Sequence, residues 1–310
     1  MQTRITELLG VKYPLLQGGM AWIADSSLAA AVSNAGGVGL IAGGAAPVEY
    51  IRGEIRKAKE LTDRPFGVNI MLMSPNAGDL AQLVIEEHVP VVTTGAGSPG
   101  RYIPAWKAAG IKVIPVIPTV ALAKRMELAG ADAVIAEGTE SGGHIGEITT
   151  MCLVPQVVDG VSIPVIAAGG IADGRGVAAA RMLGAEGVQL GTRFLAAEEC
   201  NIHPTYRELV LKAKDTDSIV TGRFTGHPCR GVKTKFSRSL LKFEQEGGTP
   251  EAFEEMTVGA LRKAVQDGNL EEGSFLCGAI AGLIHAVQPC KEIVETLFAE
   301  ADALLGRDWT

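Results

Sequence analysis

Short apolar runs alternate with segments of helical spacing along residues 13–190. Strand-like apolar runs lie at residues 13–16, 38–41, 66–70, 89–92, 113–117, 133–136, 163–168 and 188–190. Between them, apolar residues recur at helical spacing, as at 28–35 and 121–129. Because the runs are rich in Val and Ile and do not alternate with polar residues, they indicate strands that are buried on both faces of a parallel sheet.

Glycines end several of the predicted helices in the same way. Gly36, Gly110, Gly130 and Gly184 each follow a helical segment and precede a new strand. A glycine suits this position because it adopts the left-handed conformation without a Cβ penalty. Eight such strand–helix units predict an α/β protein with a (β/α)8 TIM barrel. An open, doubly wound sheet is the alternative that the same pattern allows.

The repeat stops after Phe194. Helical patterns follow at 203–213, 251–265, 275–287 and 291–305, separated by mixed, turn-rich sequence. We predict that residues 1–199 and 286–310 form the barrel and that residues 200–285 form a small C-terminal cap subdomain. The final helix is expected to return to the barrel wall.

Composition narrows the class of protein. The chain has 310 residues and a net charge of −7, which argues against nucleic acid as the main partner. Five cysteines without CxxC spacing indicate a reducing compartment and argue against a disulfide framework or a zinc site. The first ten residues lack the apolar core of a signal peptide, and no uninterrupted apolar run reaches the length of a membrane span. We therefore expect a cytoplasmic protein that contacts no membrane.

Two neighbouring predicted strands end in glycine. The run 163–168 leads into Gly169-Gly170, and the run 188–190 leads into Gly191-Thr192. Glycine lets the backbone approach a ligand closely, and free N–H groups near a helix start favour an anion. In barrels this arrangement after strands seven and eight recurs as a phosphate site. The sequence therefore favours one bound phosphate, the alternative being that these glycines only make tight turns.

Other strand ends carry further candidate residues. The first strand leads into Gly18, Gly19 and Met20, and Asn69 lies within the third apolar run. An asparagine amide both donates and accepts hydrogen bonds, which suits the edge of a heterocycle, although a packing role is the alternative. The sixth strand leads into the loop 137–146, in which His144 has glycines on either side. Histidine gives or takes a proton near neutral pH, so we favour a functional role over a structural one.

Other catalytic chemistries lack support in the sequence. Lys124 falls a turn into the helix after the fifth strand, which weakens a Schiff-base mechanism. No cluster of acidic residues, His or Cys has metal-ligand spacing, and no G-x-S-x-G motif is present. A phosphate site, glycine-lined strand ends and one loop histidine indicate that a bound phosphorylated cofactor carries most of the chemistry.

These motifs together resemble the flavin-dependent nitronate monooxygenase superfamily, and within it the enoyl-acyl carrier protein reductase II (FabK) family. The resemblance rests on residues 17–22 (QGGMAW), 67–69 (GVN), 130–134 (GADAV), 137–146 (EGTESGGHIG), 167–171 (AAGGI) and 191–194 (GTRF). The GGHIG loop is shared with the monooxygenases. The QGGMAW stretch favours the reductase, since the monooxygenases usually show Gln-Ala-Pro-Met-Ala there, and the tail at 279–283 also fits the reductase.

The resemblance implies an FMN enzyme that uses NADH or NADPH to reduce a trans-2-enoyl thioester on acyl carrier protein in fatty-acid synthesis. It implies that the FMN phosphate is held by Gly169, Gly170, Gly191 and Thr192. It further implies that Gly18, Met20, Asn69 and Glu137 line the flavin, with Ser141 and Gly143 nearby and Lys124 as an additional contact. His144 would donate the proton or polarise the thioester carbonyl. Members of the family also respond to monovalent cations, and a homodimer is the common arrangement for soluble oligomers.

A basic segment gives a hypothesis about the partner. Between residues 218 and 243 the chain has no acidic residue and six basic ones: Arg223, Arg230, Lys233, Lys235, Arg238 and Lys242. Such a segment could steer an acidic acyl carrier protein or hold the phosphates of NAD(P)H, and a solvated basic face is the alternative. Two alternatives to the reductase also remain open at this point: a nitronate monooxygenase, and a flavin-binding barrel without turnover.

Overall fold

Eight parallel strands form a closed barrel in the computed structural model, which describes residues 2–44 and 46–306. They are β1 (Leu15–Gln17), β2 (Leu40–Ala42), β3 (Gly67–Met71), β4 (Val91–Gly95), β5 (Lys112–Ile117), β6 (Val134–Glu137), β8 (Val165–Ala168) and β9 (Gly187–Leu190). The strand order is β1-β9-β8-β6-β5-β4-β3-β2, and a parallel bridge from Leu16 to Val38 closes the ring between β1 and β2. The predicted (β/α)8 barrel is confirmed, and the open sheet is wrong. Met1 and residues 307–310, which we assigned to the barrel, lie outside the described residues.

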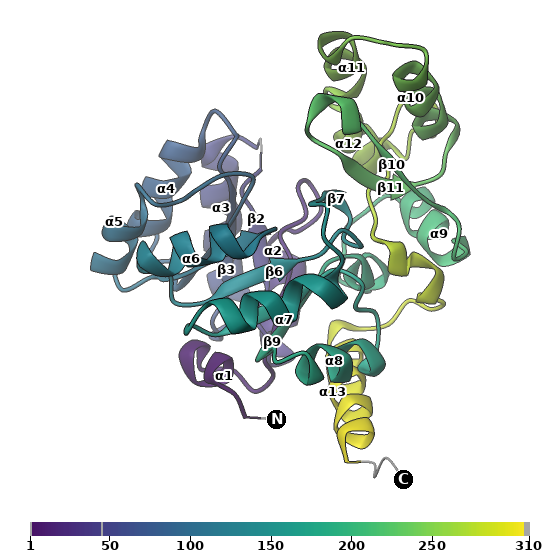
Figure 1. The fold of residues 1–310 in the computed structure, drawn as a ribbon. Coiled ribbons are helices and arrows are strands. Elements are labelled where there is room, and N and C mark those ends of the chain that lie inside the picture. The colour runs from purple at the N-terminus through teal and green to yellow at the C-terminus, as the bar shows by residue number, and fades with distance from the viewer. Residues whose placement is uncertain (1, 45, 307–310) are drawn as a thin grey trace.

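Helices surround this barrel (Figure 1). They are α2 (Ser26–Asn34), α3 (Val48–Leu61), α4 (Ala77–Glu86), α5 (Ile103–Ala108), α6 (Val120–Leu128), α7 (Thr150–Gly160), α8 (Gly174–Met182) and α13 (Cys290–Leu305). The last of these packs against α8 and α2, in the position that the eighth helix of a barrel takes. A short N-terminal helix, α1 (Arg4–Leu9), precedes β1.

The barrel interior is an apolar cluster to which strands on opposite sides of the ring contribute. Leu16, Leu40, Ile135 and Ile166 belong to one buried cluster together with Ile5 of α1. Because side chains alternate between the two faces of a strand, this set points inward while its neighbours pack under the helices. Helix α1 therefore closes the amino-terminal end of the barrel. The opposite end, where the strands finish, is left for the site.

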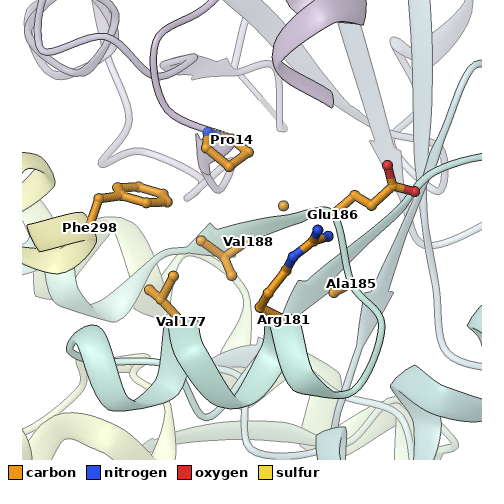
Figure 2. Close-up of a pocket in the computed structure, with 8 residues that line it drawn as sticks. Pro14, Val177, Arg181, Ala185, Glu186, Val188 and Phe298 are labelled. Carbon is orange, nitrogen blue, oxygen red and sulfur yellow. The ribbon is translucent and has the colours of Figure 1, made fainter. Parts of the chain in front are cut away.

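A small cavity at the closed end takes no part in binding. Figure 2 shows it between the start of β9, helix α8 and Phe298 of α13, with Pro14 and Glu186 at its edge. Its volume is about 10 Å³, which is room for about one water molecule. It therefore cannot hold a cofactor or substrate.

The chain after β9 builds a second lobe beside the barrel (Figure 1). It contains the short turn η1 (Thr192–Ala196), then α9 (Pro204–Lys212), β10 (Ser218–Thr221), η2 (Arg223–Thr225), β11 (Cys229–Val232), α10 (Lys235–Gln245), α11 (Pro250–Thr257), α12 (Ala260–Arg262), a π-helical turn η3 (Lys263–Asp267) and a 3-10 turn η4 (Ala279–Leu283). Phe236, Leu240 and Phe253 form its own buried core. Helix α9, however, buries Tyr206 and Val210 in the core cluster of the barrel. The division at residues 200 and 285 stays a prediction.

Two predicted helices of this lobe differ from the structure. The helix predicted at 275–287 is wrong, because only η4 coils there and the rest of the segment is extended. Gly278 shows why: an added Cβ would lie 2.7 Å from the carbonyl oxygen of Glu140, so the segment lies directly on the loop after β6. The helix predicted at 251–265 is broken at Gly259, which has a φ of 74°.

Three short strands, β7, β10 and β11, escaped the sequence prediction. Within the loop after β6, residues Gly143–His144 form β7, which pairs in antiparallel fashion with β11. Strands β10, β11 and β7 therefore make a small sheet that joins the cap to the barrel. No helix in the part of the chain that the structure describes is both long and apolar enough to cross a membrane.

Candidate active site

The candidate residues converge at the carboxyl ends of the barrel strands. Because the strands are parallel and in register, Gln17 of β1 lies beside Leu190 of β9, and Glu137 of β6 lies beside Ala168 of β8. Active sites of such barrels lie on this face. The loops that follow these strands carry most of the residues that the sequence singled out.

The two glycine turns after β8 and β9 lie next to each other. Gly169 and Gly170 have φ angles of 88° and 74°, which residues with a Cβ rarely adopt. A Cβ on Gly169 would also lie 2.9 Å from the carbonyl oxygen of Gly138. Gly191 starts the turn η1, with a backbone hydrogen bond of 2.9 Å from Phe194 N. The geometry fits an anion held by backbone N–H groups.

The loop after β1 lies across Asn69 and the β9 turn. A Cβ on Gly19 would be 2.3 Å from Cβ of Asn69, and one on Gly191 would be 3.6 Å from Sδ of Met20. Asn69 is itself oriented by a 2.8 Å hydrogen bond from its Nδ2 to Oγ1 of Thr93. The structure thus brings Met20, Asn69 and Gly191 together, as predicted from the strand ends.

Buried polar atoms at these strand ends suit a ligand with hydroxyl and heterocycle groups. Among the described residues, Oγ of Ser141 and Oε1 of Gln189 are buried without a hydrogen-bond partner. An added Cβ on Gly18 would lie 3.3 Å from Gln189, so this glutamine belongs to the same face. Buried polar groups are normally paired, so such atoms indicate a ligand. These residues fit a flavin, and Gln189 is a further candidate, which the sequence did not single out because it lies inside an apolar run.

Glu137 has an unusual protonation equilibrium. Burial at the end of β6 raises the pKa of Glu137 to about 7, although the Ser141 hydroxyl acts in the opposite direction. At neutral pH its carboxyl group is therefore protonated in a large share of molecules and can donate a hydrogen bond. A carboxylic acid that donates at pH 7 suits a ring or ribityl oxygen rather than a cation.

His144 is held at the mouth of the barrel by the cap. In the β7–β11 ladder His144 pairs with Cys229, and Gly143 pairs with Arg230. Ile145 N donates to the carbonyl oxygen of Pro228 at 3.1 Å, which continues the contact. Arg230 also donates from Nε and Nη2 to the carbonyl oxygen of Thr139, at 3.1 and 3.0 Å. The glycine-flanked loop is therefore fixed.

The loop is fixed from the barrel side as well. The carboxylate of Glu140 accepts from the backbone N and Oγ1 of Thr150, each at 2.9 Å, at the start of α7. Its backbone oxygen accepts from Ala279 N of the cap at 2.9 Å. The His144 ring remains exposed at this junction. Desolvation, followed by the proximity of His227, lowers the pKa of His144.

A second contact joins the loop after β1 to the cap. Trp22 has a φ of 63°, a strained conformation for a residue with a bulky side chain. The guanidinium of Arg262 from α12 lies over its ring, 4.9 Å from the centroid. Strain of this kind persists where surrounding contacts determine the backbone, and it often occurs at functional sites.

Lys124 lies on an outer helix, apart from the strand-end loops described above. Its side chain is exposed on helix α6, in the outer layer of the barrel. Its Cε would lie 3.5 Å from a Cβ on Gly160, the last residue of α7. Because helices run away from the strand ends, a residue a turn into α6 already faces the neighbouring helix. The assignment of Lys124 as a flavin contact stays a prediction, and the structure places its side chain beside α7.

The predicted basic segment is less free than its sequence indicates. Lys235 pairs with Glu271 at 3.1 Å, Lys242 with Glu246 at 3.6 Å and Arg223 with Glu147 at 3.5 Å. Lys233 donates to the backbone oxygen of Thr216. Acidic residues from outside the segment therefore neutralise part of its charge.

Comparisons with known proteins place the chain among flavin-dependent oxidoreductases built on this barrel. The family model for nitronate monooxygenase matches residues 2–86 and 80–300, and the chain therefore belongs to the nitronate monooxygenase family. The alternative of a flavin-binding barrel without turnover is thereby ruled out.

Individual relatives cover almost the whole chain. The structure of FabK from Thermotoga maritima is 53% identical, covers 98% of this chain and 97% of its own, and superposes with a TM-score of 0.96. A (3aS,4S,5R,7aS)-5-hydroxy-7a-methyl-1-oxo-octahydro-1H-indene-4-carboxyl-CoA dehydrogenase from Mycobacterium tuberculosis is 35% identical, over 97% of this chain and 96% of its own length. A probable nitronate monooxygenase from Staphylococcus saprophyticus is 34% identical, over 99% of both chains. The resemblance to the FabK type is confirmed.

Replacing Gly191 with alanine tests the phosphate turn without straining the fold. An added Cβ meets only Met20, at 3.6 and 3.7 Å, which is ordinary contact distance. We expect Gly191→Ala to fold normally and to bind FMN about tenfold or more weakly, a change of about 1.4 kcal/mol. The measurement is a fluorescence titration of apoprotein with FMN, beside a thermal unfolding curve.

Gly53→Ala is the matched control, because nothing lies within 4 Å of a Cβ at this position in helix α3. It should bind FMN as the unaltered protein does. Equal FMN affinity for Gly191→Ala and Gly53→Ala would remove Gly191 from the proposed phosphate site.

Proposed function

We propose that the protein is an FMN-dependent enoyl-acyl carrier protein reductase that uses NADH or NADPH to reduce trans-2-enoyl thioesters in fatty-acid synthesis. The observation that carries the proposal is the 53% identity to FabK over 98% of the chain, with a TM-score of 0.96. The site agrees with this match in its chemistry. It has glycine turns for a phosphate, polar residues at the strand ends for the rest of the cofactor, and a loop histidine for the substrate. Bound FMN would supply hydride transfer between the nicotinamide and the β-carbon of the enoyl group.

The residues of the barrel would bind and orient the cofactor. Backbone N–H groups of Gly169, Gly170, Gly191 and Thr192 would hold its phosphate, since an anion there needs no charged side chain. A contact at Thr192 supports this indirectly, because its Oγ1 accepts from Gly278 N of the cap at 2.8 Å. The turn is thereby fixed by the lobe that covers it.

A second group of residues would meet the ring and the ribityl chain. We assign this role to Gly18, Met20, Asn69, Glu137, Ser141 and Gly143. The unpaired Oγ of Ser141 would gain a partner, and the carboxyl group of Glu137, with a pKa of about 7, would donate or accept. These interactions orient the ring without a metal ion.

His144 would serve the enoyl thioester. Its ring is exposed at the mouth of the barrel and its backbone is fixed by β7. Reduction of an enoyl thioester places negative charge on the thioester oxygen and requires a proton at the α-carbon. An imidazole can stabilise the oxygen or deliver that proton, and either role lies within reach of a ring held by the cap.

The acyl carrier would dock on the exposed face of α10. Phe236 and Leu240 bury the other face of this helix in the cap, which leaves Lys235 and Arg238 exposed. Acyl carrier proteins are acidic, so a basic helix near the mouth would steer them. A solvated basic face, or contacts to the phosphates of NAD(P)H, are the competing explanations.

Further features follow from the same proposal. A location in the cytoplasm agrees with the five free cysteines, three of which are buried. A homodimer would be the common arrangement for a soluble oligomer. A monovalent cation, bound by backbone carbonyls, would be an additional ligand. Within the described residues, no group of three or more His, Cys, Asp or Glu side chains could hold a metal ion.

Nitronate monooxygenase activity is the second candidate, because the family model and the Staphylococcus saprophyticus relative both carry that description. The two activities differ in what oxidises the reduced enzyme. NADH oxidation driven by crotonyl thioester without air supports the reductase. Oxygen uptake with a nitronate, and no reaction with the thioester, would replace it with the monooxygenase.

Removing the imidazole of His144 tests its role. We expect His144→Ala to retain FMN and its reduction by NAD(P)H, because the glycine turns are untouched. The second half-reaction, with the enoyl thioester, should slow by about 10²-fold or more. Stopped-flow absorbance of the flavin separates the two steps. Turnover close to that of the unaltered enzyme would show that the proton comes from elsewhere.

Charge reversal on α10 tests the docking face. We expect Lys235→Glu/Arg238→Glu to raise KM for enoyl-acyl carrier protein about fivefold or more. The effect should be larger at low salt, because exposed charges act by attracting the approaching carrier and salt screens this attraction. KM for the corresponding enoyl-CoA should stay the same.

Lys291→Glu/Arg64→Glu is the control for net charge, since both residues are exposed on the barrel and away from α10, and the pair changes the charge by the same amount. A rise in KM for the nicotinamide instead of the carrier would assign the face to NAD(P)H. Unchanged values for both substrates would leave α10 as a solvated face.

A further inference from the structure

A second histidine lies beside His144. The ring centroids of His144 and His227 are 6.5 Å apart, with an angle of 78° between the ring planes. His227 belongs to the cap, in the turn between η2 and β11, whereas His144 belongs to the barrel loop after β6. The two imidazoles come together only because the two lobes meet.

The backbone determines this approach. His144 is the ladder partner of Cys229, and His227 lies two residues before Cys229. His227 itself lies just outside β11, in the turn that leads into it, and this turn brings its ring beside that of His144. Pro228 fixes the backbone between them, and its carbonyl oxygen accepts from Ile145 N at 3.1 Å. His227 N donates to Oγ1 of Thr225 at 3.2 Å, which holds the turn from the other side.

Other charged groups near His144 are already engaged. Glu147 pairs with Arg223 at 3.5 Å, and Arg230 donates to Thr139 and Ser218. Burial raises the pKa of the Cys229 thiol to about 11 and that of the Cys277 thiol to about 12, so both remain neutral near pH 7. Glu140 accepts from Thr150 at the start of α7. His227 is therefore the neighbouring group that can take up a proton and whose ring lies beside that of His144.

We propose that His227, which the cap supplies, is a positioning residue for His144. His227 disfavours a second positive charge at the mouth of the barrel and so weakens the binding of the proton to His144. The inference rests on the proposed role of His144 in enoyl reduction. A proton on either of two imidazoles at this separation disfavours a proton on the other by charge repulsion. The lowered pKa of His144 agrees with this coupling, although desolvation is its larger cause.

The coupling has consequences of opposite sign in two variants. His227→Asn keeps a polar side chain but removes the charge, so the pKa of His144 should rise. His227→Lys carries a permanent positive charge, so the pKa of His144 should fall. Two unit charges at this separation in a water-like dielectric change the protonation equilibrium by about threefold, and by more where solvent is excluded. A step that needs protonated His144 should persist to higher pH in His227→Asn and fail at lower pH in His227→Lys.

The experiment is an NMR titration of ring-labelled histidine in the FMN-loaded enzyme. The His144 resonance is assigned by its loss in His144→Gln. The pH profile of the second half-reaction is measured on the same samples. His285→Asn is the matched control, because His285 is exposed in the segment before α13 and lies outside the site. Opposite shifts in the two His227 variants, with none in the control, support the inference.

Two results would overturn it. An unchanged His144 titration in both variants would show that the rings do not interact, and shifts of the same sign would indicate a disturbed loop rather than charge coupling. The titration does not depend on turnover. Coupled titration in a protein that fails to reduce any enoyl thioester would therefore leave the histidine pair intact and reject the proposed function.

Discussion

The pairing of β7 with β11 is the interaction on which the site depends. A loop with glycine on both sides of His144 has no means of its own to fix the ring, since glycine loses more conformational freedom on ordering than any other residue. Two residues of ladder to the cap, reinforced by Arg230 on Thr139, provide the missing constraint. The position of the catalytic candidate is thus a property of the contact between the lobes.

The same junction explains why small residues collect there. A Cβ on Gly142 would lie 2.6 Å from the backbone of Cys277, and one on Gly169 would lie 2.9 Å from Gly138. The loop after β6, the turn after β8 and the extended cap segment therefore pack backbone against backbone. Some glycines that the sequence indicates as ligand contacts are also required for this close packing. Ligand binding and backbone packing therefore both favour glycine at the same positions.

Local patterns predicted the barrel well, because each strand is a continuous Val- and Ile-rich run bounded by glycine. They could not predict β7, which has two residues and finds its partner some 85 positions later. The segment 275–287 has apolar residues at helical spacing, but Gly278 lies against the backbone of Glu140. This tertiary contact outweighs the local helical preference, so the predicted helix does not form. The assignment of Lys124 as a flavin contact was based on family resemblance alone. The sequence could not show that its side chain lies beside α7, because this depends on the direction of α6. His227 had no signal in the sequence because its setting depends on strand register.

The division of labour between the lobes bears on specificity within the family. The glycine turns and the polar strand ends belong to the barrel, and relatives at 34–35% identity with different described activities align over nearly the whole chain. A shared cofactor cradle therefore cannot by itself select an enoyl thioester over a nitronate. The cap contributes the ladder that fixes His144, the Arg262 contact on Trp22 and the second imidazole. Differences in reaction between relatives should accordingly be sought in the cap, where one backbone register decides which side chain faces the histidine, and in the loop after β1, whose QGGMAW sequence differs from the form usual in the monooxygenases.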